Sequence, residues 1–142
     1  MKNNQINNVL AIFVLCAAAL ACSLYSEGKP AAEAGVVQFH AQLDAGNFTE
    51  IYAASHQKFK DATSEEEMVK LFTAVHTKLG AVKESTPQSW KAGNFNLVST
   101  VTLVQDTVFE NGRGTEQFTF VIEDKKAFLA GYYINSNDLI IK

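Results

Sequence analysis

The chain has 142 residues, of which 47% are hydrophobic and 11% aromatic. This length corresponds to about one domain with enough apolar residues to fill a core, which excludes a second domain and a largely disordered chain. The formal net charge is −3. Because binding to nucleic-acid phosphates relies on an excess of basic residues, we expect no nucleic-acid partner.

The first 21 residues have the composition of a signal peptide. A polar start that contains Lys2 and no acidic residue precedes an unbroken apolar stretch at 9–20, and small residues follow that stretch. A transmembrane helix needs about 20 apolar residues, and this stretch is shorter. We therefore predict export and a cleaved signal peptide at 1–21, with an uncleaved membrane anchor as the alternative.

Cysteine usage indicates how the exported protein is held. Cys16 lies in the predicted signal peptide, so the mature chain would keep only Cys22 and could form no internal disulfide. Residues 19–22, Ala-Leu-Ala-Cys, resemble the lipobox of bacterial lipoproteins, although Ala19 and Leu20 stand in the reverse of the usual order. This resemblance implies a lipidated Cys22 and a location on the periplasmic face of the bacterial outer membrane. Ordinary signal-peptidase cleavage, giving a soluble periplasmic or secreted protein, is the alternative.

A polar tether at 22–30 and two helices are predicted next. The first helix has an apolar stripe at helical spacing and ends at Gly46. The residues of this stripe are Ala32, Val36, Phe39 and Leu43. A second, shorter helix is predicted to begin with a capping-box-like pair, Asn47 and Glu50, and to end near Ser55.

The third helix is marked at both ends. Ser64 and Glu67 form a capping-box pattern at its start, and Gly80 ends it. One apolar face runs between them, formed by Met68, Leu71, Phe72, Val75 and Leu79.

After Gly80 the apolar period changes from helical to two, which predicts strands. The first strand is expected at 81–90, with Pro87 indicating a bulge or a sheet edge. A turn is expected at 92–94, and the second strand then extends from Phe95 to about residue 109. Asn111-Gly112 predicts a two-residue hairpin turn.

The last two long strands are predicted after this hairpin. Phe118, Phe120 and Ile122 should share one face of the third strand, and a turn is expected at 123–125. The residues expected on one face of the fourth strand are Phe128, Ala130, Tyr132 and Ile134. Residues 139–141 are expected to add a short final pairing. Together these elements predict one α+β domain over 31–142, with three N-terminal helices packed in a curved four-stranded antiparallel sheet.

Four short motifs carry a resemblance to the nuclear transport factor two-like, cystatin-like superfamily, and within it to its uncharacterised exported bacterial families. They are the Leu-Asp-x-Gly-Asn-Phe turn at 43–48, the segment 53–60, Leu-Gly-Ala-Val at 79–82 and Gly-Tyr-Tyr-Ile at 131–134. The resemblance implies a cone-shaped sheet around the helices, a pocket between the sheet and the first helices, and a homodimer formed through the sheet.

Polar and aromatic residues in the predicted elements are the candidates for a ligand site. The implied pocket would suit a small apolar ligand. The residues predicted to bind it are His40, Tyr52, His56, Trp90 and Tyr132, with Tyr133 as a further member of the group. The alternative for each of them is a structural role in the core.

Metal and nucleophilic chemistry are not predicted. His40, His56 and His76 are 16 and 20 residues apart, and no cysteine follows Cys22 to complete a metal site. The sequence contains neither a Gly-x-Ser-x-Gly motif nor a glycine-rich phosphate loop. We therefore predict no metal, no cofactor and no nucleophilic catalytic residue.

Acid–base catalysis is the enzymatic alternative that the resemblance implies. Isomerases and dehydratases of the superfamily use a carboxylate or a histidine that faces an aromatic hydroxyl inside the cone. Here His40, Asp44 and Asp106 are the candidate bases. Tyr52 or Tyr132 would be the donor.

The sequence thus favours a non-enzymatic exported module that binds a small ligand or another protein and is held at the membrane by its lipidated N-terminus. A small isomerase, dehydratase or cyclase with an acid–base residue in the pocket is the alternative function.

Overall fold

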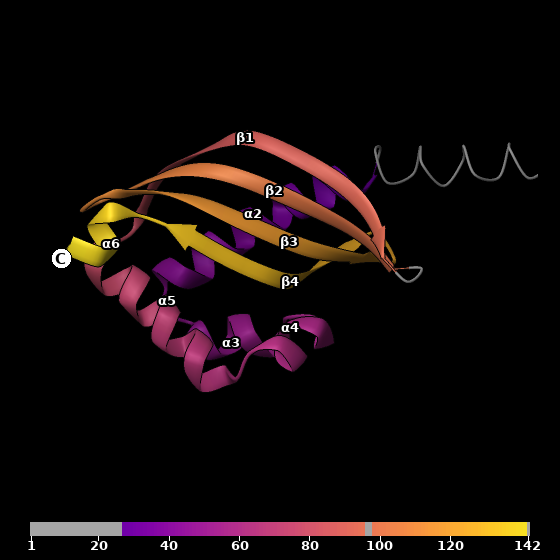
Figure 1. Ribbon diagram of the computed structural model, residues 1–142, viewed down its shortest axis with the longest axis horizontal. Helices are drawn as coiled ribbons and strands as arrows, with labels where there is room; N and C mark the ends of the chain where they lie inside the picture. The colour runs from indigo at the N-terminus through magenta and orange to yellow at the C-terminus, as the bar shows by residue number, and fades with distance from the viewer. Residues whose placement is uncertain (1–26, 96–97, 142) are drawn as a thin grey trace, which may run out of the picture.

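The computed structural model describes residues 27–95 and 98–141. The predicted signal peptide and Cys22 lie outside these residues. The elements are α2 (Lys29–Asp44), α3 (Phe48–Ala53), α4 (Gln57–Ala62), α5 (Glu65–Leu79), β1 (Val82–Phe95), β2 (Val98–Phe109), β3 (Arg113–Glu123), β4 (Lys126–Asn135) and α6 (Asn137–Ile141) (Figure 1). The predicted α+β class, with helices preceding a four-stranded antiparallel sheet, is confirmed. None of the helices in this part of the chain is long and apolar enough to cross a membrane.

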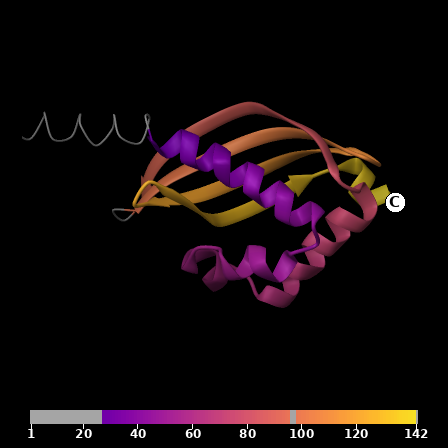
Figure 2. The ribbon, with the colours of Figure 1, turned by 180° about the vertical axis from the view of Figure 1, so that it is seen from behind.

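The sheet has the strand order β1-β2-β3-β4, and every neighbouring pair is antiparallel. Helix α2 crosses one face of the sheet and contacts all four strands (Figure 2). Helices α3 and α5 pack against each other on the β4 side of α2, and α4 contacts β4. The hydrophobic core therefore lies between the sheet and the helices.

The apolar stripes predicted for the helices supply this core. All four residues of the first stripe are buried, and Phe72 and Val75 of α5 are fully buried. The ring of Phe39 on α2 lies 5.5 Å from that of Phe72 and 5.1 Å from that of Phe118 on β3, in edge-to-face geometry. Such aromatic pairs add stability beyond the area that they bury, so Phe39 is the point where the three elements meet.

The predicted capping of the helices is confirmed for α5 and wrong for α3. The backbone N–H of Glu67 donates to Ser64 Oγ, and Glu67 Oε2 accepts from the backbone N–H of Ser64 at 3.2 Å. The hydrogen bonds that the Glu67 carboxylate accepts from the backbone N–H and the hydroxyl of Ser64 lower the pKa of Glu67 below its ordinary value. Gly80 ends the helix with a φ of 78°. Asn47 precedes α3, but its side chain makes no capping hydrogen bond.

Two short helices differ from the prediction. Helix α4 was not expected, because its six residues show less than two turns of periodicity and its N-cap is His56, whose Nδ1 accepts from the backbone N–H of Lys58. The expected strand at 139–141 is wrong, since these residues belong to α6. Ser136 Oγ accepts from the backbone N–H of Leu139 and so supports the start of this helix.

The first hairpin extends further than predicted. Residues 92–94, expected to turn, continue β1 and pair with 99–101 of β2, so the turn prediction is wrong and β2 begins at Val98 rather than Phe95. A turn was expected here because Ala92 and Gly93 interrupt the alternation of apolar and polar residues. An edge strand tolerates such small residues, so β1 continues through them. The expected irregularity at Pro87 is confirmed: the register shifts between Pro87 and Ser89 on the edge strand.

The second hairpin lies where Asn111-Gly112 predicted it, but its centre is shifted by one residue. The backbone N–H of Phe109 donates to the carbonyl of Gly112, which leaves Glu110 and Asn111 as the two central residues. The backbone N–H groups of these two residues donate to the carbonyls of Ala81 and Leu79. The end of α5 therefore fixes the turn, and the prediction of an Asn-Gly centre is wrong.

The predicted face of the fourth strand is correct only in its second half. Tyr132 and Ile134 pack against the core, but Ala127 and Leu129 take the inward positions that were expected for Phe128 and Ala130. Phe118 pairs with Tyr132 and Phe120 pairs with Leu129, so β4 contains one extra residue between these pairs. This β-bulge reverses the alternation at Ala130.

Candidate functional site

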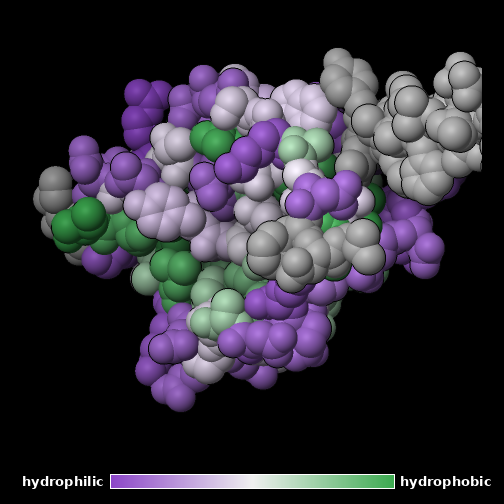
Figure 3. Space-filling view, turned by 45° about the vertical axis from the view of Figure 1, so that its right-hand side comes forward, coloured by the Kyte–Doolittle hydropathy of each residue, from purple (hydrophilic) through white to green (hydrophobic). Residues whose placement is uncertain are grey.

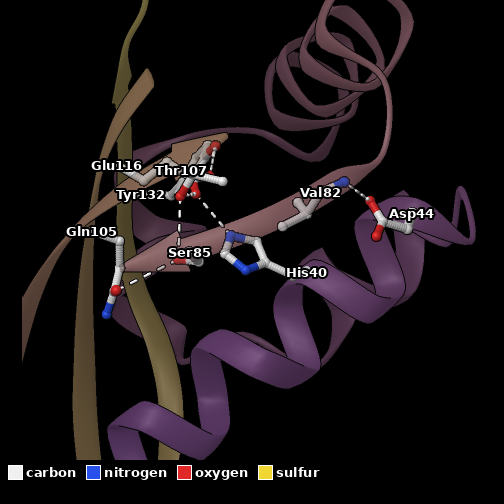
Figure 4. Close-up of polar contacts among 8 residues, drawn as sticks. All are labelled: His40, Asp44, Val82, Ser85, Gln105, Thr107, Glu116 and Tyr132. Atoms are coloured by element: carbon white, nitrogen blue, oxygen red, sulfur yellow. Dashed lines mark hydrogen bonds and ion pairs between the residues drawn. The ribbon is translucent and has the colours of Figure 1, made fainter. Parts of the chain in front are cut away.

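A buried cluster of polar side chains lies between α2 and the sheet, centred on Glu116 of β3 (Figure 4). The carboxylate of Glu116 is 0% exposed. Its Oε1 accepts a hydrogen bond of 2.7 Å from the hydroxyl of Tyr132 on β4. Its Oε2 lies 2.7 Å from Nε2 of His40 on α2 and accepts a hydrogen bond of 2.5 Å from Oγ1 of Thr107 on β2.

The cluster continues toward the edge of the sheet. Ser85 Oγ on β1 lies 3.2 Å from Thr107 Oγ1. It also lies 3.5 Å from Oε1 of Gln105, which is buried. The Thr107 hydroxyl donates its one hydrogen to Glu116, so it can only accept from Ser85, whose single hydrogen has Thr107 Oγ1 and Gln105 Oε1 as alternative acceptors. A chain of hydrogen bonds therefore runs from β1 through β2 to Glu116, and from there to α2 and β4.

The electrostatics of the cluster follow from the burial of the carboxylate. A buried carboxylate is stable only when it is paired and hydrogen-bonded, and both oxygens of Glu116 have partners. Tyr132 as a whole is half-buried, and its hydroxyl is bonded to the fully buried carboxylate of Glu116. Burial of this hydroxyl, together with the adjacent charge of Glu116 and the hydrogen bond to it, raises the pKa of Tyr132 well above its ordinary value. Tyr132 therefore acts as a hydrogen-bond donor to Glu116.

The structure brings two of the predicted ligand residues together and adds one that the sequence analysis missed. His40 and Tyr132 both contact Glu116, each through a different oxygen of the carboxylate. The sequence did contain a sign that Glu116 is buried. It lies two and four residues before Phe118 and Phe120, so all three side chains point to the same, buried face of β3. An acidic residue at an inward position of a strand is rare unless it is paired, and it is therefore a marker of a buried site.

The other three predicted ligand residues lie elsewhere. The hydroxyl of Tyr52 donates to the carbonyl of Thr63 at 2.8 Å. His56 caps α4, and its Nε2 lies 3.3 Å from Oε1 of Glu123 at the β3–β4 turn. Trp90 lies on β1 beneath Lys29, whose Nζ is 5.9 Å from the ring centroid. Each of these three residues therefore has a contact within the fold.

The remaining candidates are separate from the cluster. Asp44 Oδ1 accepts from the backbone N–H of Val82 and thereby joins the end of α2 to the start of β1. Asp106 is exposed on the outer face of the sheet, where its Oδ1 accepts from Thr115 Oγ1. Tyr133 is 62% exposed. The carboxylate nearest to His40 and Tyr132 is therefore that of Glu116 and not that of either predicted aspartate.

A groove with a volume of about 380 Å³ lies between α2, α3 and the β3–β4 hairpin. Its lining comprises Ala31, Ala34, Gly35, Gln38, Phe39, Gln42, Ile51, Ala54, Ser55, Phe120, Lys125, Lys126, Ala127, Phe128 and Leu129. Four of these residues, Phe39, Ile51, Phe120 and Leu129, are buried hydrophobics that continue into the core. None of the five predicted ligand residues belongs to this lining, and neither does Glu116.

Small residues on α2 keep the groove open. Ala31, Ala34 and Gly35 contribute little side-chain volume along this side of the helix. A Cβ atom at Gly35 would lie 2.7 Å from Cε1 of Phe120, so glycine is required for the close approach of α2 to β3. The groove is thus an apolar recess in the packing between helix and sheet.

Other recesses in the described part of the surface are similar to the groove in volume or larger, but their linings differ from it. Hydrophobic residues gather in patches at the left and lower centre of the face drawn in Figure 3, with hydrophilic residues around them. The exposed large hydrophobic residues Val37, Tyr133 and Ile140 lie on three different elements, α2, β4 and α6. A second cavity of about 560 Å³ is lined mainly by polar residues of β2, β3 and the segment 135–138. Within 27–95 and 98–141, no group of three or more metal-ligating side chains is found.

A scan of protein-family models gives no match to this chain, and a search of curated proteins gives none either. The function must therefore be inferred from the two sites themselves.

Proposed function

We propose that this chain is an exported, non-enzymatic binding module of the nuclear transport factor two-like, cone-shaped class, which holds a small apolar or amphipathic ligand in the groove between α2, α3 and the β3–β4 hairpin. The groove is the observation that carries this proposal. Its volume of about 380 Å³ lies in the range of about 300–1,000 Å³ that small-ligand pockets occupy. Its lining combines buried apolar side chains with a few polar groups, the composition that such pockets favour.

The buried cluster supports a binding module rather than an enzyme. A general base must reach the proton that it abstracts. Both oxygens of Glu116 are already engaged by His40, Thr107 and Tyr132. The groove is lined by Phe39 and Gln42 of α2 but not by His40. We therefore assign Glu116 a structural role, in which it holds α2 against the sheet.

An acid–base enzyme is the second candidate, and one observation favours it. Glu116 lies within 2.7 Å of both a histidine and a tyrosine, which are groups that accept and donate protons in catalysis. A substrate of such an enzyme would have to displace Tyr132 or Thr107 from the carboxylate. It would therefore contact β2 and β4 beside Glu116, whereas a ligand of the groove would contact α3 and the β3–β4 hairpin.

A substitution inside the groove tests the proposal. Ala34 is exposed and lines the groove, so Ala34→Phe should fill the groove without disturbing the core. Titration with the neutral fluorescent probe N-phenyl-1-naphthylamine should give an affinity at least about tenfold weaker for this variant than for the unmodified protein, because the phenyl ring would occupy the space of the ligand. Val37→Phe is the matched control, since Val37 is exposed on the same helix and does not line the groove.

The outcome separates the candidates. Equal affinity of the probe for the Ala34→Phe variant and the unmodified protein would contradict binding in the groove. Amide chemical shifts recorded in the same titration should change at 31–42 of α2 and at Ala54 and Ser55. Changes centred instead on Thr107, Glu116 and Tyr132 would favour the enzyme.

A further inference from the structure

We infer that the groove binds a free single-chain amphiphile with a carboxylate head, whose head group contacts Lys125 and Lys126 and whose chain lies along α2. This inference rests on the proposed function and specifies the class of ligand.

The charge of the groove is the first argument. Lys125 and Lys126 line it, and they are the only charged residues among the described residues of its lining. Both lysines come from the tip of the β3–β4 hairpin, so the positive charge is concentrated at one end of an otherwise uncharged recess. The chain as a whole has a net charge of −3. The groove is therefore complementary to an anion, in contrast to the protein that contains it.

The availability of the two ammonium groups is the second argument. Lys126 is exposed and forms no ion pair with any other residue in the part of the chain that the structure describes. Lys125 Nζ lies 3.0 Å from Oε1 of Glu27, but the two side chains are 75% and 44% exposed. Exposed pairs of this kind contribute little, so a ligand carboxylate can compete with Glu27 for Lys125.

The backbone of the hairpin is the third argument. Asp124 and Lys125 are the central residues of the turn, and their φ values are 48° and 63°. Positive φ is well tolerated by glycine and by aspartate but is unfavourable for lysine. A side chain that is kept at the cost of backbone strain, at the rim of a recess, indicates a functional use of that side chain.

The shape of the groove favours a single chain. The residues of α2 that line it extend from Ala31 to Gln42, which is about 16 Å along a helix. The volume of about 380 Å³ is at the lower end of the range for ligand pockets. A narrow recess with apolar walls and a cationic end fits an alkyl chain with one anionic group better than a broad polar molecule.

The neighbours of the lysines favour a free ligand over an anionic membrane. Glu123 and Asp124 precede the two lysines at the same hairpin tip but do not line the groove. A flat anionic surface would meet all four charges, two of each sign. A single carboxylate inside the groove would contact the two lysines and displace Glu27 from Lys125.

Calorimetric titration of the protein with decanoate and with 1-decanol, both below the concentrations at which they aggregate, tests the inference. The two probes share their alkyl chain and differ in head-group charge. We expect decanoate to bind about tenfold more tightly than 1-decanol, as two exposed ion pairs would provide, and the preference to weaken at high salt. The combined substitution of Lys125→Gln and Lys126→Gln should abolish the preference. The combined substitution of Lys70→Gln and Lys91→Gln, two exposed lysines outside the groove, should preserve it.

Each result has a distinct meaning. If neither probe binds, the proposed function fails and the inference fails with it. If both probes bind with equal affinity and the Lys125 and Lys126 substitutions have no effect, the inference fails while the proposed function stands. If decanoate does not bind but the protein floats with vesicles of phosphatidylglycerol and phosphatidylcholine through Lys125 and Lys126, the ligand is a membrane surface and the inference is overturned.

Discussion

Glu116 connects four elements through a single carboxylate. It lies on β3 and has hydrogen-bonding partners on α2, β2 and β4. Replacing any one partner leaves a buried charge or a buried polar atom without compensation, and this costs more than the hydrogen bond itself contributes. Glu116 therefore specifies how α2 lies on the sheet.

The first prediction concerns the coupling between His40 and Glu116. The substitution His40→Phe should lower the free energy of unfolding by about 3 kcal/mol, because it leaves Glu116 as an incompletely paired buried charge. The double variant with Glu116→Leu should lose clearly less than the sum of the single losses, with a coupling energy of at least about 1 kcal/mol. Urea denaturation measures the free energy of unfolding of the unmodified protein, the two single variants and the double variant. The pair of His56 and Glu123, with an exposed carboxylate, is the control and should couple by less than about 0.5 kcal/mol. Additive effects at His40 and Glu116 would contradict the structural role of the cluster.

The second prediction concerns alkaline pH. The pKa of the Tyr132 hydroxyl is raised in the folded protein. Above a pH of about 10, the hydroxyl of Tyr132 therefore loses its proton in the unfolded chain while the folded protein still retains it. The contribution of Tyr132 is therefore fully present below pH 10, and the free energy of unfolding falls above it by up to about 1.4 kcal/mol per pH unit. Urea denaturation between about pH 8 and 11 should show this fall in the unmodified protein and in Tyr133→Phe, and a smaller fall in Tyr132→Phe. If the free energy of unfolding fell equally with pH in all three proteins, this role of Tyr132 would be contradicted.

At the scale of the elements, the β3–β4 turn combines a favourable shape with an unfavourable residue. A two-residue turn with positive φ at both central positions matches the twist of antiparallel strands. Aspartate followed by glycine is a preferred sequence for this turn, but here the second position is Lys125. The turn therefore retains strain that a single substitution can remove.

The third prediction follows from this strain. Lys125→Gly should raise the free energy of unfolding by about 0.5–1 kcal/mol, because glycine adopts a φ of 63° without steric cost. The same variant should bind decanoate more weakly, since it lacks one ammonium group. Lys126→Gly is the control and should not be stabilised, because residue 126 lies in the strand. Loss of stability in Lys125→Gly would show that the turn is not strained at this position.

The elements that were predicted correctly are those whose signals are local. The stripe from Ala32 to Leu43 and the capping box at Ser64 are complete within their own helices, so no distant residue was needed to interpret them. The errors arise where distant segments decide the outcome. The centre of the turn at Glu110 is fixed by hydrogen bonds to the end of α5, and the inward face of β4 is reversed by a bulge that its pairing with β3 imposes.

The candidate site could be predicted only in part for the same reason. His40 and Tyr132 were expected to share a pocket, and the fold does bring them to one carboxylate. The position of Glu116 along β3 indicated that it is buried, but its contact with Thr107 depends on the register of β3 against β2. The groove was unpredictable as a set of residues, because α2, α3 and the β3–β4 hairpin meet only through tertiary packing.

At the scale of the whole molecule, we propose export and attachment to a membrane through Cys22. The fourth prediction is that Cys22→Ser removes labelling of the protein by a palmitate analogue in cells and shifts it from the membrane fraction to the soluble fraction. Cys16→Ser is the matched control, because this residue would be removed with the signal peptide, and it should leave both properties unchanged. Labelling that persists in Cys22→Ser would contradict lipidation and favour ordinary cleavage.

The two outer strands of the sheet bear on the solubility of the protein. An unpaired strand edge can recruit the same edge of another copy and begin aggregation. Along β1, Pro87 has no backbone N–H to offer, and the register shift beside it interrupts the row of unpaired backbone groups at this edge. Along β4, the carbonyl of Leu129 is already occupied by the backbone N–H of His56. A proline and a helix cap, neither of which lines the groove, thus disfavour pairing of the two sheet edges with the edge of another copy.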